Sequence, residues 1–542
     1  MSTSEAVLPT LEISREDDPR VVQEAATEDY SLHVVPKTWR LTRGGLQMAW
    51  WALITAIFYM YVAALVAITI GTGAAIVGLA VTCAIYSVIN IIINRAAAES
   101  GLTVALFSRA MFGFVGAAFA TIVFAATAIY YFVFEGSIVA VAAQQFFADQ
   151  GLDLDIKIWY LLIVLYTMPL VMRGVRVWLD RFNAWLLPVY AIGLIAVLIW
   201  VTSDAGGYDG GWAHLPATAD VTGPGWIWAV SVYMGVWVLM MYTMDYARLG
   251  RRQDLGYSSV VTFGPVFYFF TFFVNGLVGI YLVDQLSIEQ LGEGELATAM
   301  VGVTGLVGLG LIFVTQSRIN TANLYLASTN LQSFGSRALQ LHFPRTVWVL
   351  IAGAITYLIM LTNVFSFILD ALAYQGIAIV AWVSIALVHI AYVRRTVGLA
   401  SMEFRPGRVP ALNPGGIGSV IVATAVGVIL KLTDEAFFGT WGLPVVFAVG
   451  AILYAAALRI APERWFVLRR PHDPLDEVSD PWEDRVRCYH CSKMYLAREV
   501  DRDPSHGHQP ICASCAAGPA FYAAAHREAH ADHPSPPPAA VS

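Results

Sequence analysis

Hydrophobic and polar stretches alternate along most of the chain at the spacing of membrane helices. A helix needs about 20 consecutive apolar residues to cross a bilayer, and runs of this kind recur from residue 46 to residue 459. They predict twelve transmembrane helices, over 46–70, 74–94, 114–147, 158–172, 182–202, 226–248, 259–283, 298–330, 346–362, 364–393, 416–431 and 440–459. The composition agrees, since 58% of the residues are hydrophobic and 13% are charged, against about 25% charged in an average soluble domain. The pattern therefore predicts an all-α polytopic membrane protein.

The loops between these runs alternate in charge. Arginine- and lysine-rich stretches such as "PKTWRLTRGG", "ARLGRRQDLG" and "YVRRTVGLASMEFRPGR" are separated by acidic or weakly basic ones such as "ADQGLDLDIK" and "VDQLSIEQLGEGE". Basic residues gather on the cytoplasmic side of a membrane. We therefore expect a multi-pass protein of the plasma membrane with both termini in the cytoplasm.

The two ends of the chain differ from its apolar middle. Residues 1–36 are polar and acidic and lack the apolar core of a signal peptide, so we expect a disordered cytoplasmic arm. The transmembrane domain then occupies 37–465. After it we expect a cytoplasmic zinc-binding module over 466–525 and a disordered His- and Pro-rich tail over 526–542.

Four of the five cysteines lie in this C-terminal module. Their motifs "CYHC" and "CASC" have the spacing C-x2-C-x20-C-x2-C and comprise Cys488, Cys491, Cys512 and Cys515. This spacing fits a four-thiolate zinc site, whereas the alternative, a pair of disulfides, is rare in the cytoplasm. A nearby histidine, His490, His506 or His508, could replace one thiolate. We expect a structural zinc ion, because four thiolates leave no open position for catalysis, in a module that regulates the protein or binds a cytoplasmic partner.

A few ionisable side chains interrupt the apolar runs. They are Glu135, Asp245, Arg318 and Asp370. Such residues are costly in hydrocarbon and usually mark a functional site. Asp245 lies beside several arginines, and Asp370 lies close to a short connection, so each could equally sit at an interface.

Glu135 has about ten apolar residues on either side, which predicts a position deep in the membrane. Tyr131 precedes it by four residues and therefore shares its helical face. An aromatic ring beside a carboxylate suits a flat solute that forms hydrogen bonds. The alternative is a buried ion pair of Glu135 with Arg318 that ties two helices together.

Polar side chains also cluster in the run "TQSRINTANLYLASTN". Arg318, Asn320 and Asn323 recur there, and asparagine is a poor helix former. We expect this segment to line water or ligand, because interhelical hydrogen bonds of about 0.6 kcal/mol each are a weak reason for the whole set. On the sixth run, Trp237 is central and either packs in the core or stacks on a ligand.

Three segments together resemble the nucleobase:cation symporter family, which comprises cytosine, purine, allantoin and hydantoin permeases. They are "SRAMFGFVG" between spans two and three, "DYARLGRR" at the end of span six, and "NTANLYLASTNLQS" in span eight. The resemblance covers about residues 36–460. It implies a LeuT-like fold, in which spans one to five and six to ten form inverted repeats, spans one and six are broken, and two accessory helices follow.

The same resemblance implies roles for single residues. The substrate would stack between Tyr131 and Trp237, and Asn323 would read its edge. Glu135 stands where the family has a glutamine that binds the ligand. The chain departs from the family near Trp237, because Met244 replaces the usual proline.

The largest departure concerns the coupling ion. Sodium-coupled members bring small hydroxyl residues of span eight to the ion, and the matching positions here hold Ser317 and Arg318. An arginine offers donors and no acceptor, so we expect sodium to be excluded and Glu135 to carry a coupling proton.

The sequence therefore predicts a secondary transporter that imports a planar nucleobase or related heterocycle. It carries no phosphate-binding loop or nucleophile elbow, so we expect neither an enzyme nor a nucleic-acid partner. The alternatives are a transporter-derived sensor that signals through the zinc module, and a transporter for an amino acid or similar zwitterion.

Overall fold

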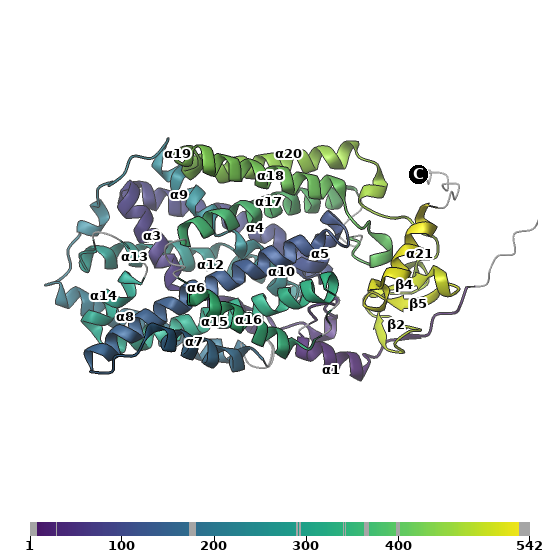
Figure 1. The fold of residues 1–542 in the computed structure, drawn as a ribbon, viewed down its shortest axis with the longest axis horizontal. Helices are drawn as coiled ribbons and strands as arrows, with labels where there is room; N and C mark the ends of the chain where they lie inside the picture. The colour runs from purple at the N-terminus through teal and green to yellow at the C-terminus, as the bar shows by residue number, and fades with distance from the viewer. Residues whose placement is uncertain are drawn as a thin grey trace, which may run out of the picture.

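The computed structural model describes residues 8–28, 30–172, 180–288, 291, 294–339, 341, 343–362, 368–396 and 402–530. Long helices run side by side through most of the molecule, and a small module of strands and short helices covers one end of them (Figure 1). The chain is a multi-pass membrane protein, and the predicted all-α class of its main domain is confirmed.

The helices that could cross a membrane follow the predicted order. In the described part of the chain, seven helical runs are long and apolar enough to do so: α4 (Thr72–Ser100), α6 (Ala117–Asp149), Ala184–Asp204 within α8 (Asp180–Asp204), the run Arg252–Gln285, Asp370–Val393 within α17 (Ile368–Thr396), α18 (Pro414–Thr433) and the run Glu435–Ile460. Two bent pairs add two more. The shorter apolar helices α7 (Ile156–Val171) and α16 (Arg345–Met360), with the long but polar α15 (Leu306–Ala338), supply the remaining crossings that the sequence predicts.

Two of these runs contain several short elements. The run Arg252–Gln285 consists of α11 (Leu255–Tyr257), α12 (Pro265–Tyr268), α13 (Asn275–Gln285) and the turns between them. The run Glu435–Ile460 consists of α19 (Glu435–Phe437), a single wide turn and α20 (Leu443–Ile460). A further short helix, α14 (Glu295–Thr304), precedes α15.

Two spans are broken. The first consists of α2 (Arg43–Trp50), the short helix η2 (Trp51–Thr55) and α3 (Ile57–Ile70), with a bend of 44° at the extended residue Ala56. The sixth consists of α9 (Gly225–Met234) and α10 (Val238–Ala247), with a bend of 47° that begins at Gly235. Glycine is a poor helix former. The breaks lie five spans apart, at the positions that a repeat of five plus five spans would place them.

The helices sort into two groups by their packing. The first group is α3, α4, α9, α10 and α13, which pack mainly on one another. The second is α6, α7, α15 and α16, in which α6 lies along α15 over most of its length. The helix α5 (Val104–Phe112) links α4 to α6, and α17, α18 and α20 form a separate layer (Figure 1).

A small module covers one end of the helical domain (Figure 1). It is formed by the described residues of 8–36 and by residues 466–530. We call it the terminal module. Strands β1 (Ile13–Ser14), β2 (Arg485–Arg487) and β3 (Met494–Leu496) form an antiparallel sheet in that order, with Ile13 opposite Val486. Strand β4 (Val500–Asp503) pairs with β5 (Gln509–Cys512), and α21 (Pro519–His530) follows.

The prediction of a disordered N-terminal arm is wrong for its described part. Residues 13–14 join the sheet, and α1 (Pro19–Glu28) packs on the module through Val21, together with Leu11. The arm alone has little apolar surface, but the C-terminal segment provides the surface that orders it. The C-terminal boundary also shifts, because residues 526–530 belong to α21. The rest of the predicted tail, and residues 1–7 of the arm, lie outside the described residues.

Candidate functional site

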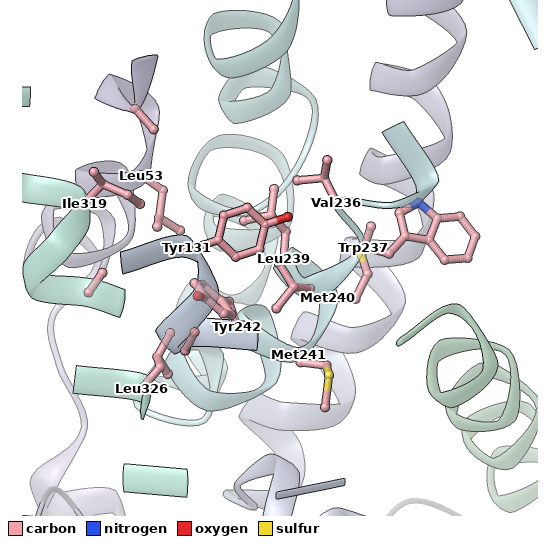
Figure 2. Close-up of a cluster of buried hydrophobic side chains, with 14 of the residues drawn as sticks. Leu53, Tyr131, Val236, Trp237, Leu239, Met240, Met241, Tyr242, Ile319 and Leu326 are labelled. Carbon is pink, nitrogen blue, oxygen red and sulfur yellow. The ribbon is translucent and has the colours of Figure 1, made fainter. Parts of the chain in front are cut away.

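A cavity lies where the two broken spans meet the second helix group. Its empty volume is about 280 Å³, including space open to solvent. The first group contributes residues next to the two breaks, and the second group contributes residues of α6 and α15 (Figure 2). The lining consists of Leu53, Phe58, Tyr59, Tyr131, Glu135, Val236, Val238, Leu239, Tyr242, Ile319 and Asn323.

Tyr131 and Glu135 lie one turn apart on α6 and both line this cavity, as the helical spacing predicts. Both are buried, with exposed fractions of 6% and 1%. The Tyr131 hydroxyl and Glu135 Oε2 have no hydrogen-bond partner among the described residues. Unpaired buried polar atoms cost roughly 1–3 kcal/mol each. The cavity thus presents one hydroxyl and one carboxylate to whatever enters it.

Asn323 on α15 supplies a third polar group to the cavity. The Tyr242 hydroxyl donates to Asn323 Oδ1 at 3.0 Å, while Asn323 Nδ2 has no partner in the described part of the chain. This arrangement leaves the amide as a donor. The predicted place of Asn323 beside Tyr131 and Glu135 agrees with the structure.

Aromatic rings surround these polar atoms. The Phe58 ring stands edge-on to that of Tyr131, with centroids 5.3 Å apart and planes at 85°. Tyr59 and Tyr242 complete the aromatic part of the lining. Ring faces and edges of this kind suit a flat ligand, since aromatic groups prefer offset or edge-on contacts.

Trp237 does not line the cavity and is buried in the core, the alternative to ligand stacking that the sequence left open. Its indole points away from Tyr131 (Figure 2) and meets Tyr86 and Phe447 edge-on, at centroid distances of 6.5 and 5.5 Å. The bend before α10 turns position 237 toward α4 and α20, while Val236 and Leu239 face the cavity. The bend is therefore what separates the direction of Trp237 from that of Val236 and Leu239.

Two other predicted residues also lie elsewhere. Ser317 Oγ is 2.9 Å from the hydroxyl of Tyr166 on α7 and donates to the Phe313 carbonyl, so it faces away from the first span. Asn320 is buried where α15 meets α6 beside Gly136 and is absent from the cavity lining. Neither side chain lines the cavity, and their contact with ion or substrate stays a prediction.

Arg318 joins α15 to the break of the first span. The residue is fully buried, and its Nη2 donates to the main-chain carbonyl of Trp51 at 2.9 Å. Among the described residues it forms no ion pair with Glu135, so the alternative of a buried pair between them is not realised. The carboxylate and the guanidinium therefore belong to two separate places.

Several main-chain carbonyls at this break accept hydrogen bonds from side chains. Besides the bond from Arg318, the Thr55 hydroxyl donates to the Ala52 carbonyl at 3.1 Å, and Asn275 Nδ2 of α13 donates to the Ile54 carbonyl at 2.5 Å. Unwound carbonyls inside a membrane need such partners. Here protein donors supply them.

The other two intramembrane carboxylates have structural partners. Asp245 Oδ1 accepts from the main-chain N–H of Val104 at the start of α5, at 2.8 Å. Asp370 pairs with Lys431 at 3.2 Å and is largely exposed. Neither lines the cavity.

Sequence reasoning missed Phe58, Tyr59 and Tyr242. The first two follow the break of span one, where an uninterrupted apolar run gives no signal of a bend. Tyr242 had a weak signal, because it lies one turn after Leu239 on the helix that follows Gly235.

A candidate metal centre lies in the terminal module. The sulfur atoms of the four cysteines, Cys488, Cys491, Cys512 and Cys515, lie within 4.8 Å of one another. A tetrahedral zinc ion with Zn–S bonds of about 2.3 Å needs sulfurs about 3.8 Å apart, so the residues fit. Main-chain N–H groups of Cys512 and Cys515 donate to two of the sulfurs, at 3.3 and 3.5 Å.

A cavity between two broken helices of a many-helix membrane domain is the arrangement found in secondary transporters. No protein-family model and no curated protein matches the chain. Solved structures do match. Two structures of Mhp1, a nucleobase-cation-symport-1 family transporter, one closed with bromovinylhydantoin bound and one inward facing, give TM-scores of 0.63 and 0.62 at 16% identity. They cover 78% and 79% of this chain and 93% of theirs.

A Na⁺-coupled sialic acid symporter in a substrate-bound outward-open state is also similar. Its TM-score is 0.51 at 15% identity, and the match covers 80% of this chain and 92% of that one. The likeness establishes the fold that these transporters share. The LeuT-like fold predicted from the resemblance is therefore confirmed.

Proposed function

We propose that this chain is a secondary active transporter that imports a planar nucleobase or a related heterocycle, and that it uses protons and not sodium. One observation carries the proposal: Tyr131, Glu135 and Asn323 line an aromatic cavity between two broken spans with polar atoms that no described residue binds. The fold shared with Mhp1 supports it. No covalent chemistry is part of this function.

The polar atoms define what the ligand must offer. Glu135 accepts hydrogen bonds, so the ligand needs N–H groups on one edge. Asn323 Nδ2 donates, so the ligand needs a carbonyl or ring nitrogen on another edge. A nucleobase or hydantoin-like ring carries both kinds of group on a flat frame.

Proton coupling follows from the isolation of Glu135. A carboxylate enclosed without a cation is costly, and among the described residues Glu135 has no cationic partner. A proton that arrives with the substrate removes that charge while the cavity is closed. Release of the proton and the substrate to the other side completes the cycle.

Sodium independence follows from Arg318. The resemblance assigns this region of span eight, facing the break of span one, to the sodium ion of coupled family members. Here the guanidinium itself binds the Trp51 carbonyl, and a second cation beside it would be repelled. Replacing sodium with choline is expected to leave uptake unchanged.

The terminal module supports the predicted orientation. Arg40, Arg248, Arg252 and Arg405 lie at the end of the helical domain that the module covers, and basic residues mark the cytoplasmic side. We assign the module to the cytoplasm of a plasma-membrane protein and zinc to its four cysteines. Elemental analysis of the purified protein tests the metal, with one zinc per chain expected.

The alternatives differ in what they need. A zwitterionic amino acid would place its ammonium group against Glu135, but its carboxylate would meet no cationic side chain among the residues that line the cavity. A sensor would bind its ligand without moving it. Accumulation against a gradient separates transport from sensing.

The experiment uses purified protein in liposomes with an imposed pH gradient and a labelled base. Unlabelled pyrimidines, purines and hydantoins compete for uptake and identify the preferred ring. Concentrative uptake that collapses with a protonophore and persists in choline supports the proposal. Saturable binding without uptake, or uptake that requires sodium, overturns it.

A further inference from the structure

A segment of the N-terminal arm is buried between the helix ends and the terminal module. Tyr30, Val34 and Val35 are each less than 5% exposed. On the helix side, Arg248 at the end of α10 donates to the Tyr30 carbonyl at 3.1 Å, and the Val35 N–H donates to the carbonyl of Gly101, after α4, at 3.3 Å. The segment therefore closes over the ends of two helices of the first group.

The metal-binding half of the module holds this segment from the other side. The Glu499 carboxylate accepts from the Val34 N–H and lies 3.1 Å from His33 Nδ1. The Glu499 carbonyl in turn accepts from the N–H of Ala513, next to the ligand Cys512, at 2.8 Å. The His33 ring stacks on Tyr495 of β3, with centroids 5.2 Å apart. A short chain of contacts thus leads from the cysteine cluster to the arm.

Trp482 is a second contact with the first helix group. Its ring lies under the guanidinium groups of Arg40 and Arg252, each 5.3 Å from the ring centroid. Arg40 also donates to the Gly250 carbonyl at 2.9 Å, and Arg252 to the Glu99 carbonyl at 2.8 Å. The tryptophan therefore joins the module to the ends of α4 and α10.

The terminal module also contacts the start of the second helix group. The Tyr522 ring of α21 stacks on Phe114, just before α6, with centroids 5.6 Å apart. Beside it, the 402–413 loop that leads into α18 is held by buried ion pairs. Arg405 binds Asp473 at 2.7 Å, and Arg408 binds Asp501 at 3.1 Å.

We propose that the terminal module is a metal-dependent latch: binding of a thiophilic divalent cation by the four cysteines holds the module end of the transport path closed. The latch regulates the transport site and rests on the proposed function. The cavity lies between the two helix groups, and access to it from this end requires their ends to separate. One folded body attached to both groups opposes that separation.

Metal controls the latch because a module of this size folds around its ion. Without the ion, the chain from Cys512 through Glu499 to the arm loses its anchor. The arm alone lacks the apolar surface to stay ordered. A ligand shifts a conformational equilibrium only by its preference for one state, and the metal-bound module has that preference because it contacts both helix groups in the arrangement of this structure.

Hydrogen exchange of the full-length protein in detergent, with and without a membrane-permeant zinc chelator, tests the latch without any substrate. Removal of the metal is expected to raise amide exchange about tenfold or more in residues 30–36 and at the ends of α4 and α10, since exchange reports local opening. The far end of the helices, around 211–225, is expected to stay unchanged. Unchanged exchange at residues 30–36 after verified metal loss overturns the proposal.

Variants separate the latch from simple unfolding of the module. Trp482→Ala leaves the cysteines intact, so it is expected to keep its metal and still show faster exchange at the ends of α4 and α10. Cys488→Ser with Cys512→Ser is expected to lose the metal and mimic the chelator. Two controls are expected to match the wild type: Cys83→Ser, outside the cluster, and Glu463→Gln, which removes an exposed pair with Arg469. Wild-type exchange in Trp482→Ala overturns the role of that contact.

Transport supplies the second readout. In liposomes, chelation is expected to speed substrate exchange by something on the order of threefold in the wild type and to have no effect on the double cysteine variant. Metal-sensitive exchange of the arm without uptake of any base would refute the proposed function and leave the latch. Base uptake that ignores metal, together with unchanged hydrogen exchange, would refute the latch and leave the transporter.

Discussion

Buried polar groups differ between the cavity and the terminal module in whether they have hydrogen-bond or ion-pair partners. In the cavity, Tyr131, Glu135 and Asn323 each have an atom that no described residue binds. In the module, Asp501 binds both Arg408 and Arg470, at 3.1 and 2.6 Å, and all three are almost fully buried. Unpaired atoms are available to a ligand, whereas paired ones hold the fold together. We therefore expect the cavity to bind a ligand and the terminal module to stabilise the fold.

The charge state of the module fits this reading. Burial would raise the pKa of Asp473, but Arg405 and Arg408 lower it from 3.8 to about 2. A carboxyl with a depressed pKa contributes stability above about pH 4 that is lost only as the pH falls through 2. The ion pairs of Asp473 therefore persist at neutral pH, and we expect the pH response of the proposed transport to come from other groups.

The strongest test of the comparison is Glu135→Gln. For coupling to one proton, a gradient of one pH unit supports about tenfold accumulation, since 1.4 kcal/mol is a factor of ten. The variant has no carboxylate to titrate, so its accumulation is expected to fall to equilibrium while downhill exchange persists. Uptake into liposomes at several pH gradients measures this. Asp370→Asn, at an exposed pair, is the control and should accumulate normally. Retained concentrative uptake in Glu135→Gln would remove this residue from coupling.

The next test breaks the paired region. Asp501→Asn removes one carboxylate from two buried guanidinium groups, while Arg408 keeps Asp473 and Arg470 keeps Glu528. Because each guanidinium retains a partner, the expected cost lies at the low end of the about 3–5 kcal/mol for breaking a buried pair. The thermal transition of the module, followed by release of its metal in the full-length protein, is expected to fall accordingly. Glu463→Gln, in the exposed pair with Arg469, should cost less than about 1 kcal/mol. Equal stabilities of the two variants would contradict the contrast drawn between the two regions.

The smallest expected effect distinguishes two aromatic residues. Tyr131→Phe deletes a hydroxyl that no described residue binds, so stability should hold, while substrate affinity falls about fivefold for the loss of one hydrogen bond of about 1 kcal/mol. Trp237→Phe changes a ring outside the cavity and should leave affinity unchanged. Equilibrium binding of a labelled base to both variants decides between them. The reverse result would restore the stacking role first predicted for Trp237.

The sequence by itself determined the class of fold and the cysteine cluster. Apolar runs of fixed length and an alternation of loop charge are properties of the chain and the bilayer, so twelve spans can be read from them. The spacing of Tyr131 and Glu135 also sufficed, because a regular helix converts four residues into one turn. The two C-x2-C motifs predicted that the four cysteines lie close together, because one metal ion needs ligands from both motifs.

Only the tertiary structure decided which of the predicted residues line the same cavity. The direction of Trp237 depends on a bend of 47° that the local sequence does not reveal, and the partner of Arg318 is a carbonyl on a span more than 250 residues earlier. The arm of residues 8–36 is ordered by strands about 470 residues away. Such contacts depend on where whole helices are placed, and their free energy comes from surfaces that neither segment possesses alone.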